Sequence, residues 1–244
     1  MNKLVIVRHG LTEWSGRFTG WTDIDLAPAG IEMAKKYALR LKENNFTFDL
    51  GFASFLKRGI KTLEIFLEVM GLQNIPVVHD WHLNERHYGA LQTLNKAETV
   101  AKYGEDQVNI WRRSYATPPP PLLQNDPRNP ALDPLYKDVD KSKIPMGESL
   151  KDTYERSVPY FINNVLSEVK NGKKVILSGH HNSLRSIIKY LENISDEEIV
   201  KLNVPYCIPL IYEFDDNMKV LKHYYLGTDE EVKLVIDSIK NQIK

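Results

Sequence analysis

An arginine, a histidine and a glycine directly follow an apolar run near the start of the chain. Residues 4–7 are Leu-Val-Ile-Val, which predicts a short buried strand, and Arg8, His9 and Gly10 stand at its carboxyl end. Open α/β sheets bind their ligands at that edge. A guanidinium there can hold a phosphate group while a neutral imidazole nitrogen attacks phosphorus. The tripeptide therefore indicates phosphoryl transfer through His9.

A second strand-like run also ends in a histidine. Residues 175–177 are Val-Ile-Leu, and His180 follows three residues later. Because the carboxyl ends of parallel strands meet at one edge of a sheet, we expect His9 and His180 to face each other across one crevice. One imidazole would attack phosphorus and the other would donate to the phosphoryl oxygens. Arg58 lies near the start of a predicted helix, whose positive dipole end also favours anions.

Glu85 stands among cationic and aromatic residues in the stretch 83–89. A carboxylate in such surroundings can carry a proton to and from a substrate hydroxyl. Arg112 and Arg113 add positive charge further along, and Asn182 begins a predicted helix whose backbone N–H groups point to the same crevice. Phosphoryl transfer asks mainly for positioning and charge neutralisation, so these groups would suffice without a metal.

The elements that must position these residues alternate between strands and helices. Helical periodicity and helix-end signals predict helices over residues 29–45, 55–70, 149–169 and 228–244, and short apolar runs predict further strands over 49–53 and 77–78. This alternation indicates an α/β fold, with a mostly parallel central sheet and helices on both faces. We expect one domain over residues 1–244. The proline-rich stretch over about 117–145 predicts a long loop or lid inserted in that domain.

The overall composition is that of an ordinary globular protein. The 244 residues are 42% hydrophobic and 26% charged, with a formal net charge of zero, so no global field attracts nucleic acid or an anionic membrane. The single cysteine, Cys207, excludes an intrachain disulfide and fits a reducing compartment. The sequence shows no signal peptide and no long apolar span. We therefore expect a cytoplasmic enzyme with neither a nucleic-acid nor a membrane partner.

Taken together, the motifs resemble the cofactor-dependent phosphoglycerate mutases of the histidine phosphatase superfamily. The resemblance covers nearly the whole chain and is carried by residues 8–10, 17–21, 83–89, 111–113 and 180–185. The run Leu-Asn-Glu-Arg-His-Tyr-Gly-Ala-Leu-Gln at 83–92 is specific to this branch. The resemblance implies a three-layer, histidine phosphatase-like fold. It also implies interconversion of 3-phosphoglycerate and 2-phosphoglycerate, in glycolysis and gluconeogenesis, through a phosphohistidine intermediate.

The resemblance further implies a role for each matching residue. His9 would carry the phosphoryl group, Glu85 would donate and accept the proton, and His180 would stabilise the group in transfer. The remaining candidates would hold the phosphate or the glycerate substrate: Arg8, Ser15, Thr19, Gly20, Arg58, Tyr88, Lys96, Arg112, Arg113, His181 and Asn182. 2,3-Bisphosphoglycerate would prime the enzyme by phosphorylating His9. The resemblance implies no metal, and it implies that the protein forms a homodimer or a homotetramer.

The chain departs from the family pattern around the expected crevice. The loop after Trp14 is two residues shorter, and Ser15 replaces an asparagine that touches the phosphate. His181 stands where the family has glycine, and Tyr206-Cys207 replaces Thr-Gly. These changes leave two alternatives open. One is a bisphosphoglycerate mutase or phosphatase of the same superfamily, in which water accepts the phosphoryl group. The other is a catalytically weak relative that binds metabolites.

Overall fold

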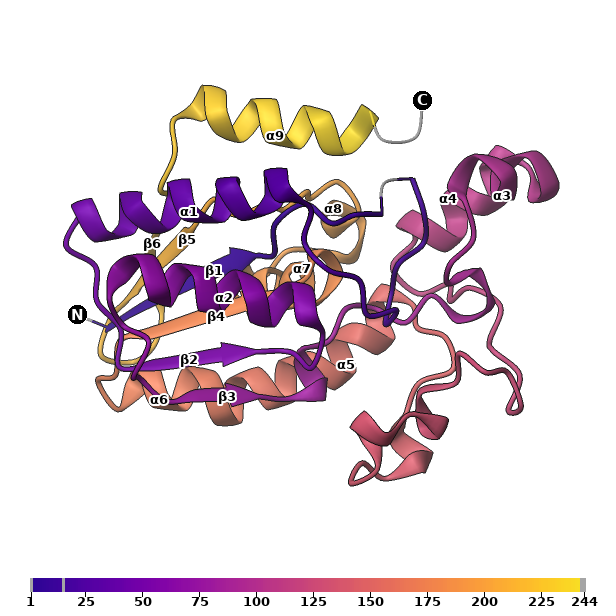
Figure 1. Ribbon diagram of the computed structural model, residues 1–244, viewed down its shortest axis with the longest axis horizontal. Coiled ribbons are helices and arrows are strands. Elements are labelled where there is room, and N and C mark those ends of the chain that lie inside the picture. Colours follow the sequence, from indigo (N-terminus) through magenta and orange to yellow (C-terminus); the bar gives the residue numbers. More distant parts are fainter. Residues whose placement is uncertain (1, 15, 242–244) are drawn as a thin grey trace.

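A six-stranded sheet forms the centre of the computed structural model, which describes residues 2–14 and 16–241 (Figure 1). The strand order is β3-β2-β4-β1-β5-β6. Strands β1 to β4 pair in parallel, whereas β5 and β6 are antiparallel. The strands are β1 (Asn2–Arg8), β2 (Leu50–Ala53), β3 (Val77–His79), β4 (Val175–Gly179), β5 (Leu210–Phe214) and β6 (Val220–Tyr225). The prediction of a mostly parallel sheet is confirmed, and β5 and β6 add an antiparallel edge that the sequence analysis did not predict.

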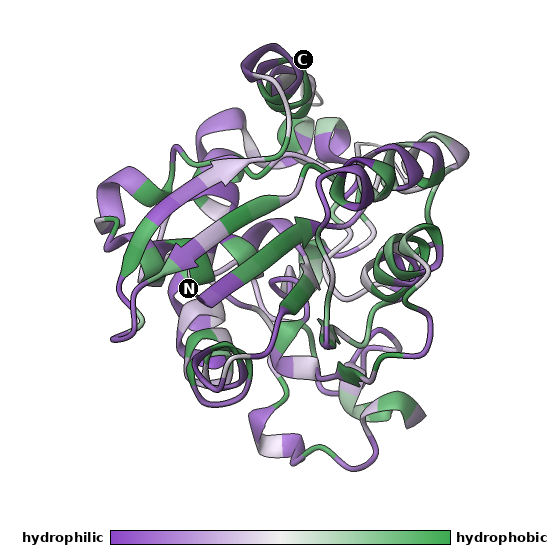
Figure 2. Ribbon diagram, turned by 90° about the vertical axis from the view of Figure 1, so that its left-hand side faces the viewer, coloured by the Kyte–Doolittle hydropathy of each residue, from purple (hydrophilic) through white to green (hydrophobic). Residues whose placement is uncertain are grey.

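Helices cover both faces of this sheet. On one face lie α1 (Pro28–Glu43), α2 (Lys57–Met70) and α9 (Asp229–Asn241), and on the other lie α5 (Leu150–Tyr160), α6 (Ser167–Lys170) and α7 (His181–Glu192). Along β1, Val5 and Val7 pack toward the first group, while Leu4 and Ile6 pack toward the second. Both faces of the strand are therefore buried, which explains its unbroken apolar run. Figure 2 shows this hydrophobic character along the central strands.

The predicted helices are present, with boundaries set by local chemistry. Pro28 occupies the first turn of α1, where its missing N–H has no cost. Gly71 ends α2 with a φ of 75°, a left-handed conformation that glycine adopts readily. The predicted helix over 149–169 is instead divided into α5, a π-helical segment Phe161–Leu166 and α6. Pro159 lies in the last turn of α5, where it cannot donate a backbone hydrogen bond.

Helices α3 (Lys96–Tyr103) and α4 (Glu105–Arg113) lie outside the predicted set. The short helix α8 (Asp196–Ile199) follows Ser195, whose side chain caps it by accepting from the N–H of Glu198. The proline-rich stretch holds three short 3-10 turns, Pro130–Leu132, Pro134–Tyr136 and Lys141–Lys143. Tyr136 from this stretch packs with Trp21, Trp81 and Ile144 in a small cluster of its own, separate from the two clusters that flank the sheet. The stretch therefore has an ordered, packed base, and its closure over a ligand stays a prediction.

The C-terminal helix α9 packs on α1 through Glu231, which pairs with Lys36 at 2.7 Å and with Arg40 at 2.5 Å. The predicted extension of this helix over 242–244 lies outside the described residues. Within the part of the chain that the structure describes, no helix combines the length and the apolar character needed to cross a membrane.

Candidate active site

The two strand-end histidines lie side by side at the carboxyl edge of the sheet. Strands β1 and β4 are parallel neighbours, with Arg8 opposite Gly179. The backbone N–H of His9 donates to the Gly179 carbonyl at 3.0 Å. The ring centroids of His9 and His180 are 5.1 Å apart, and both side chains are buried. Two imidazoles from distant parts of the sequence can therefore act on one phosphoryl group.

The tautomer of His9 follows from its surroundings. Its Nδ1 lies 2.7 Å from the carbonyl oxygen of Gly10. A carbonyl can only accept, so Nδ1 carries the proton and Nε2 keeps a free lone pair. Burial lowers the pKa of His9 well below 6.5, and the nearby guanidinium groups of Arg58 and Arg8 lower it further. At neutral pH the ring is thus an uncharged nucleophile with Nε2 available.

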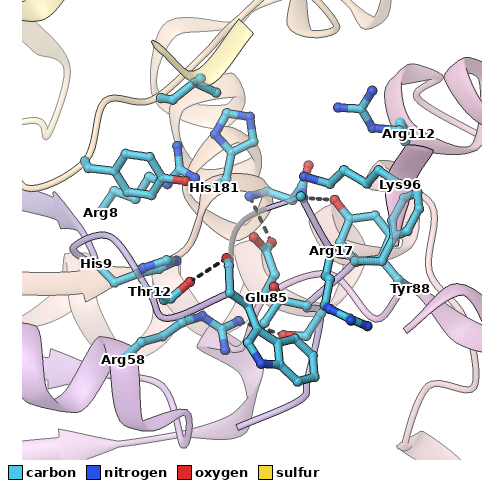
Figure 3. A pocket seen from close by; sticks show the side chains of 18 of the residues that line it. Arg8, His9, Thr12, Arg17, Arg58, Glu85, Tyr88, Lys96, Arg112 and His181 are labelled. Atoms are coloured by element: carbon cyan, nitrogen blue, oxygen red, sulfur yellow. Dashed lines mark hydrogen bonds between the residues drawn. The ribbon is translucent and has the colours of Figure 1, made fainter. Parts of the chain in front are cut away.

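Glu85 is a buried carboxylate with one oxygen fixed by the backbone. Its Oε1 accepts from the N–H groups of Arg86 at 2.8 Å and Asn182 at 3.0 Å. Asn182 is in the first turn of α7, where backbone N–H groups lack helical partners. Oε2 makes no hydrogen bond with the described residues, so it can serve a ligand. Figure 3 shows Glu85 at the centre of the pocket, between Arg58 on one side and Tyr88 on the other.

A buried ion pair holds the backbone that carries Glu85. The guanidinium of Arg156 donates to both carboxylate oxygens of Glu148, at 2.6 and 2.9 Å. It also donates to the carbonyl groups of Trp81 at 3.2 Å, His82 at 2.7 Å, Asn84 at 3.3 Å and Glu85 at 3.2 Å. Glu148 in turn accepts from the backbone N–H of His87 at 2.8 Å. The other partners of Arg156 and Glu148 are main-chain groups, which any residue supplies, so no sequence motif signals this pair.

Cationic side chains dominate the pocket that these residues face. They are Arg8, Arg17, Arg58, Lys96, Arg112, Arg113 and Arg185, and Glu85 is the one acidic residue among the described lining. Burial lowers the pKa of Arg58 and of Arg112 to about 10, so both remain charged at neutral pH. Burying so much positive charge is unfavourable unless an anion compensates it. The pocket therefore suits a ligand with more than one negative charge.

Local structure fixes where these cations lie. The side chain of Asn95 caps α3 by accepting from the N–H groups of Ala97 and Glu98, which sets Lys96 at the first helical position. Arg112 and Arg113 end α4, where the negative end of the helix favours cations. Arg58 donates to the carbonyl groups of Gly20 at 2.6 Å and Thr22 at 2.9 Å, so it also holds the loop that follows β1.

The helix after His180 contributes two more side chains. Asn182 accepts from Arg185 through Oδ1 at 3.0 Å and donates to the Tyr88 hydroxyl through Nδ2 at 3.3 Å. Its amide N–H₂ is thereby directed toward the pocket. Burial lowers the pKa of His181 well below 6.5, and Arg8 and Arg185 lower it further, so this imidazole is uncharged. The side chain of His181 lies in the pocket, where the family pattern has none (Figure 3).

The structure brings most of the predicted site residues together. Those that line the pocket are Arg8, His9, Thr19, Gly20, Arg58, Glu85, Tyr88, Lys96, Arg112, Arg113, His181 and Asn182. His180 packs against the ring of His9, and Ser15 lies outside the described residues. His87 is fully buried against Trp21, at a centroid distance of 5.5 Å, and so does not rim the site. The roles of all these residues stay predictions.

The site also contains residues that the sequence analysis did not select. Arg17 and Arg185 lie within the quoted motifs, so their position beside named candidates was an available signal. Tyr206, one of the departures from the family pattern, stacks on the Arg8 guanidinium at 3.7 Å. Asn203 also lies in the lining and carries no sequence signal. Among residues 2–14 and 16–241, no group of three or more His, Cys, Asp or Glu side chains is arranged to hold a metal ion.

Comparison with known proteins identifies the family. Residues 4–226 match the Histidine phosphatase superfamily (branch 1). A 2,3-bisphosphoglycerate-dependent phosphoglycerate mutase of Treponema denticola is 50% identical over 244 residues, covering 99% of each chain. The protein of the same name from Borreliella afzelii is 50% identical over 246 residues, covering 100% of this chain and 99% of its own.

Solved structures agree with this family at the level of the fold. A mycobacterial glucosyl-3-phosphoglycerate phosphatase superposes with a TM-score of 0.66 at 21% identity, covering 92% of this chain and 96% of its own. The alpha-ribazole phosphatase of Shigella flexneri gives a TM-score of 0.66 at 22% identity, with 90% and 94% covered. The predicted histidine phosphatase-like fold is confirmed, and the chain belongs to branch 1 of the histidine phosphatase superfamily.

Proposed function

We propose that this protein is a 2,3-bisphosphoglycerate-dependent phosphoglycerate mutase, which interconverts 3-phosphoglycerate and 2-phosphoglycerate in glycolysis and gluconeogenesis. The observation that carries the proposal is an uncharged His9, with Nε2 free, in a cationic pocket that holds a single carboxylate, Glu85. Full-length relatives that are 50% identical and bear this name support the choice of substrate.

In the first half-reaction, phosphorylated His9 transfers its phosphoryl group to the free hydroxyl of a bound phosphoglycerate. The Glu85 carboxylate removes the proton of that hydroxyl, the oxygen attacks phosphorus, and the N–P bond to Nε2 breaks, which leaves an uncharged His9 and a glycerate with two phosphate groups. The hydrogen bond from Nδ1 to the Gly10 carbonyl orients the ring and stabilises the positive charge that develops on it. Arg8 and Arg58 offset the charge on the transferring group.

In the second half-reaction, Nε2 of the uncharged His9 attacks the phosphorus of the other phosphate group. The N–P bond forms again while the P–O bond breaks, and the proton held by Glu85 goes to the leaving oxygen, so the isomeric phosphoglycerate leaves and His9 is phosphorylated again. The hydrogen bonds of Glu85 to two backbone N–H groups keep the carboxylate in place for both directions. One group thus serves as acid and base for neighbouring hydroxyls of the same substrate.

The residues also fit the priming phosphoryl donor that the relatives' names imply. Two arginines of the pocket lining each have a buried guanidinium nitrogen without a partner among the described residues, namely Nε of Arg8 and Nε of Arg185. Lys96, Arg112 and Arg113 supply charge for a second anionic group. When bound, 2,3-bisphosphoglycerate would supply the phosphoryl group that converts His9 to its active form. The resemblance to the family further supports a cytoplasmic, metal-independent, single-domain enzyme that forms a homodimer or homotetramer.

A phosphatase of the same superfamily is the second candidate. It would use the same phosphohistidine but transfer the group to water. His181 favours this alternative, because its imidazole takes space in the pocket where the family pattern has glycine. A looser hold on glycerate would let water reach the phosphoryl group.

An assay that couples 2-phosphoglycerate formation to enolase, while tracking free phosphate, separates the two. We expect mutase turnover that depends on 2,3-bisphosphoglycerate, with little phosphate released. Phosphate release without formation of 2-phosphoglycerate would reject the mutase and favour the phosphatase.

A further inference from the structure

Three neighbouring strands end in polar side chains that contact one another in a row. Strand β2 pairs with β4 and β4 pairs with β1, so Ser54, His180 and His9 follow adjacent strand ends. Nε2 of His180 lies 2.7 Å from the hydroxyl oxygen of Ser54, and both side chains are fully buried. The other ring nitrogen of His180, Nδ1, is buried and has no partner among the described residues.

The hydrogen-bonding capacity of Ser54 decides which nitrogen of His180 carries the proton. Its hydroxyl oxygen already accepts from the backbone N–H of Leu56 at 3.1 Å. The hydroxyl hydrogen needs an acceptor, and Nε2 of His180 is the one that the described residues place within hydrogen-bond distance. If Nε2 were protonated instead, the buried hydroxyl hydrogen would have no acceptor, which is unfavourable. Ser54 therefore donates, Nε2 accepts, and Nδ1 holds the ring proton.

The surroundings keep this pair in place. Helix α2 passes so close that a Cβ at Gly59 would lie 3.1 Å from the Ser54 hydroxyl oxygen and 3.3 Å from Nε2 of His180. The ring of His180 packs against the ring of His9, at a centroid distance of 5.1 Å. Nδ1 is thus the nitrogen left for a phosphoryl group carried on His9. A proton on Nδ1 would donate to a phosphoryl oxygen, whereas a lone pair there would repel it.

We propose that Ser54 is a positioning residue that fixes His180 in the Nδ1–H tautomer, so that this nitrogen donates to the phosphoryl group during transfer. This role rests on the proposed phosphohistidine chemistry. Ser54 touches neither substrate nor the reacting atoms, and it acts through the ring of His180.

The tautomer can be read directly in the full-length protein labelled with ¹⁵N-histidine. Two-bond ¹⁵N–¹H correlation spectra distinguish Nδ1–H from Nε2–H, and His180→Gln identifies the His180 signals by their loss. We expect the Nδ1–H pattern in the unmodified protein and its partial or complete replacement in Ser54→Ala. Turnover of Ser54→Ala should fall by about tenfold or more, the size seen when the partner of a functional histidine is removed. KM for phosphoglycerate should change little.

Ser178→Ala is the matched control. Ser178 is also a fully buried serine near this edge, but its hydroxyl donates to the Gly59 carbonyl at 2.8 Å and makes no hydrogen bond with the His180 ring. Ser178→Ala should keep the His180 tautomer and most of the turnover. An Nε2–H pattern in the unmodified protein, an unchanged pattern in Ser54→Ala, or equal turnover in the two serine variants would overturn the proposal. The tautomer is observed without substrate, so it tests Ser54 even if the mutase assay fails.

Discussion

Arg156→Met should lower the free energy of unfolding strongly and impair proton transfer by Glu85. Arg156 and Glu148 form a buried ion pair, with side chains only 7% and 3% exposed. Methionine keeps most of the apolar length of the side chain and removes the charge. The change leaves the Glu148 carboxylate buried without its partner. It also removes the donor shared by four carbonyl groups of the segment that ends at Glu85.

The magnitude follows from the burial of the pair. Removing one member of a buried ion pair costs about 3–5 kcal/mol, because the other charge stays uncompensated. Glu148→Met should cost less, since Arg156 would keep its four carbonyl partners. In the double variant neither charge is left alone, so its loss should be smaller than the two single losses added together, by about 1–3 kcal/mol. The freed segment would also displace Glu85, so turnover should fall more than substrate binding weakens.

Urea unfolding and the enolase-coupled assay measure the two effects. The midpoint should fall with little change in slope, which marks a loss of stability rather than a change of unfolded state. Lys151→Met is the control: Lys151 lies on the same helix and pairs with Glu155 at 3.8 Å, with side chains 54% and 62% exposed. It should change stability by less than about 1 kcal/mol. An Arg156→Met variant as stable and active as this control would refute the reasoning.

The remaining predictions concern the acid–base group, pH and the loop after His9. Glu85→Gln should lower turnover by about a hundredfold or more in the enolase-coupled assay, and full activity would exclude Glu85 as the proton carrier. Burial lowers the pKa of His9, His180 and His181 well below 6.5, and it lowers the pKa of His87 to about 3. Below about pH 6.5 the unfolded chain binds protons that the folded protein does not. The free energy of unfolding should therefore decrease as the pH is lowered, by up to about 1.4 kcal/mol for each histidine and each pH unit. Urea unfolding at falling pH tests this, and a flat profile would contradict it. Gly30→Ala would place a Cβ 2.2 Å from the carbonyl oxygen of Leu11, so the loop after Gly10 must move. We expect lower turnover and a lower melting temperature, and a variant with neither change would show that the loop adapts freely.

The sequence was most informative where chemistry and local structure coincide. The apolar runs that became β1 and β4 are short and buried on both faces, so their ends could be placed within two residues. Because the two strands are parallel neighbours, placing their ends also placed His9 beside His180. The same logic put Arg58 at the start of α2 and Asn182 in the first turn of α7.

Apart from the buried strand β5, the missed elements have a weak apolar pattern. Strand β6 has no buried residue, and it pairs only with β5 at the edge of the sheet. Helix α3 has one buried residue and α4 has one, so neither shows a clear apolar face. In the proline-rich stretch, the short turns are capped by Asn129, Asp133 and Asp140, which act over two residues and leave no periodic signal.

Contacts across the fold could not be predicted from one sequence. Besides Glu148, the partners of Arg156 are main-chain carbonyl groups. The stacking of Tyr206 on Arg8 joins residues almost 200 positions apart. The sequence did not define where the ring of His181 lies. Its place in the pocket depends on how α7 meets the surrounding arginines, which only the assembled fold defines.

The central claim is that His9 carries the phosphoryl group, and intact-mass measurement after exposure to 2,3-bisphosphoglycerate tests it most directly. The account predicts one added phosphoryl group on the unmodified protein, located at His9 by peptide mapping, and none on His9→Ala. An unmodified protein that gains no phosphoryl group, or one that carries it on another residue, would contradict the account.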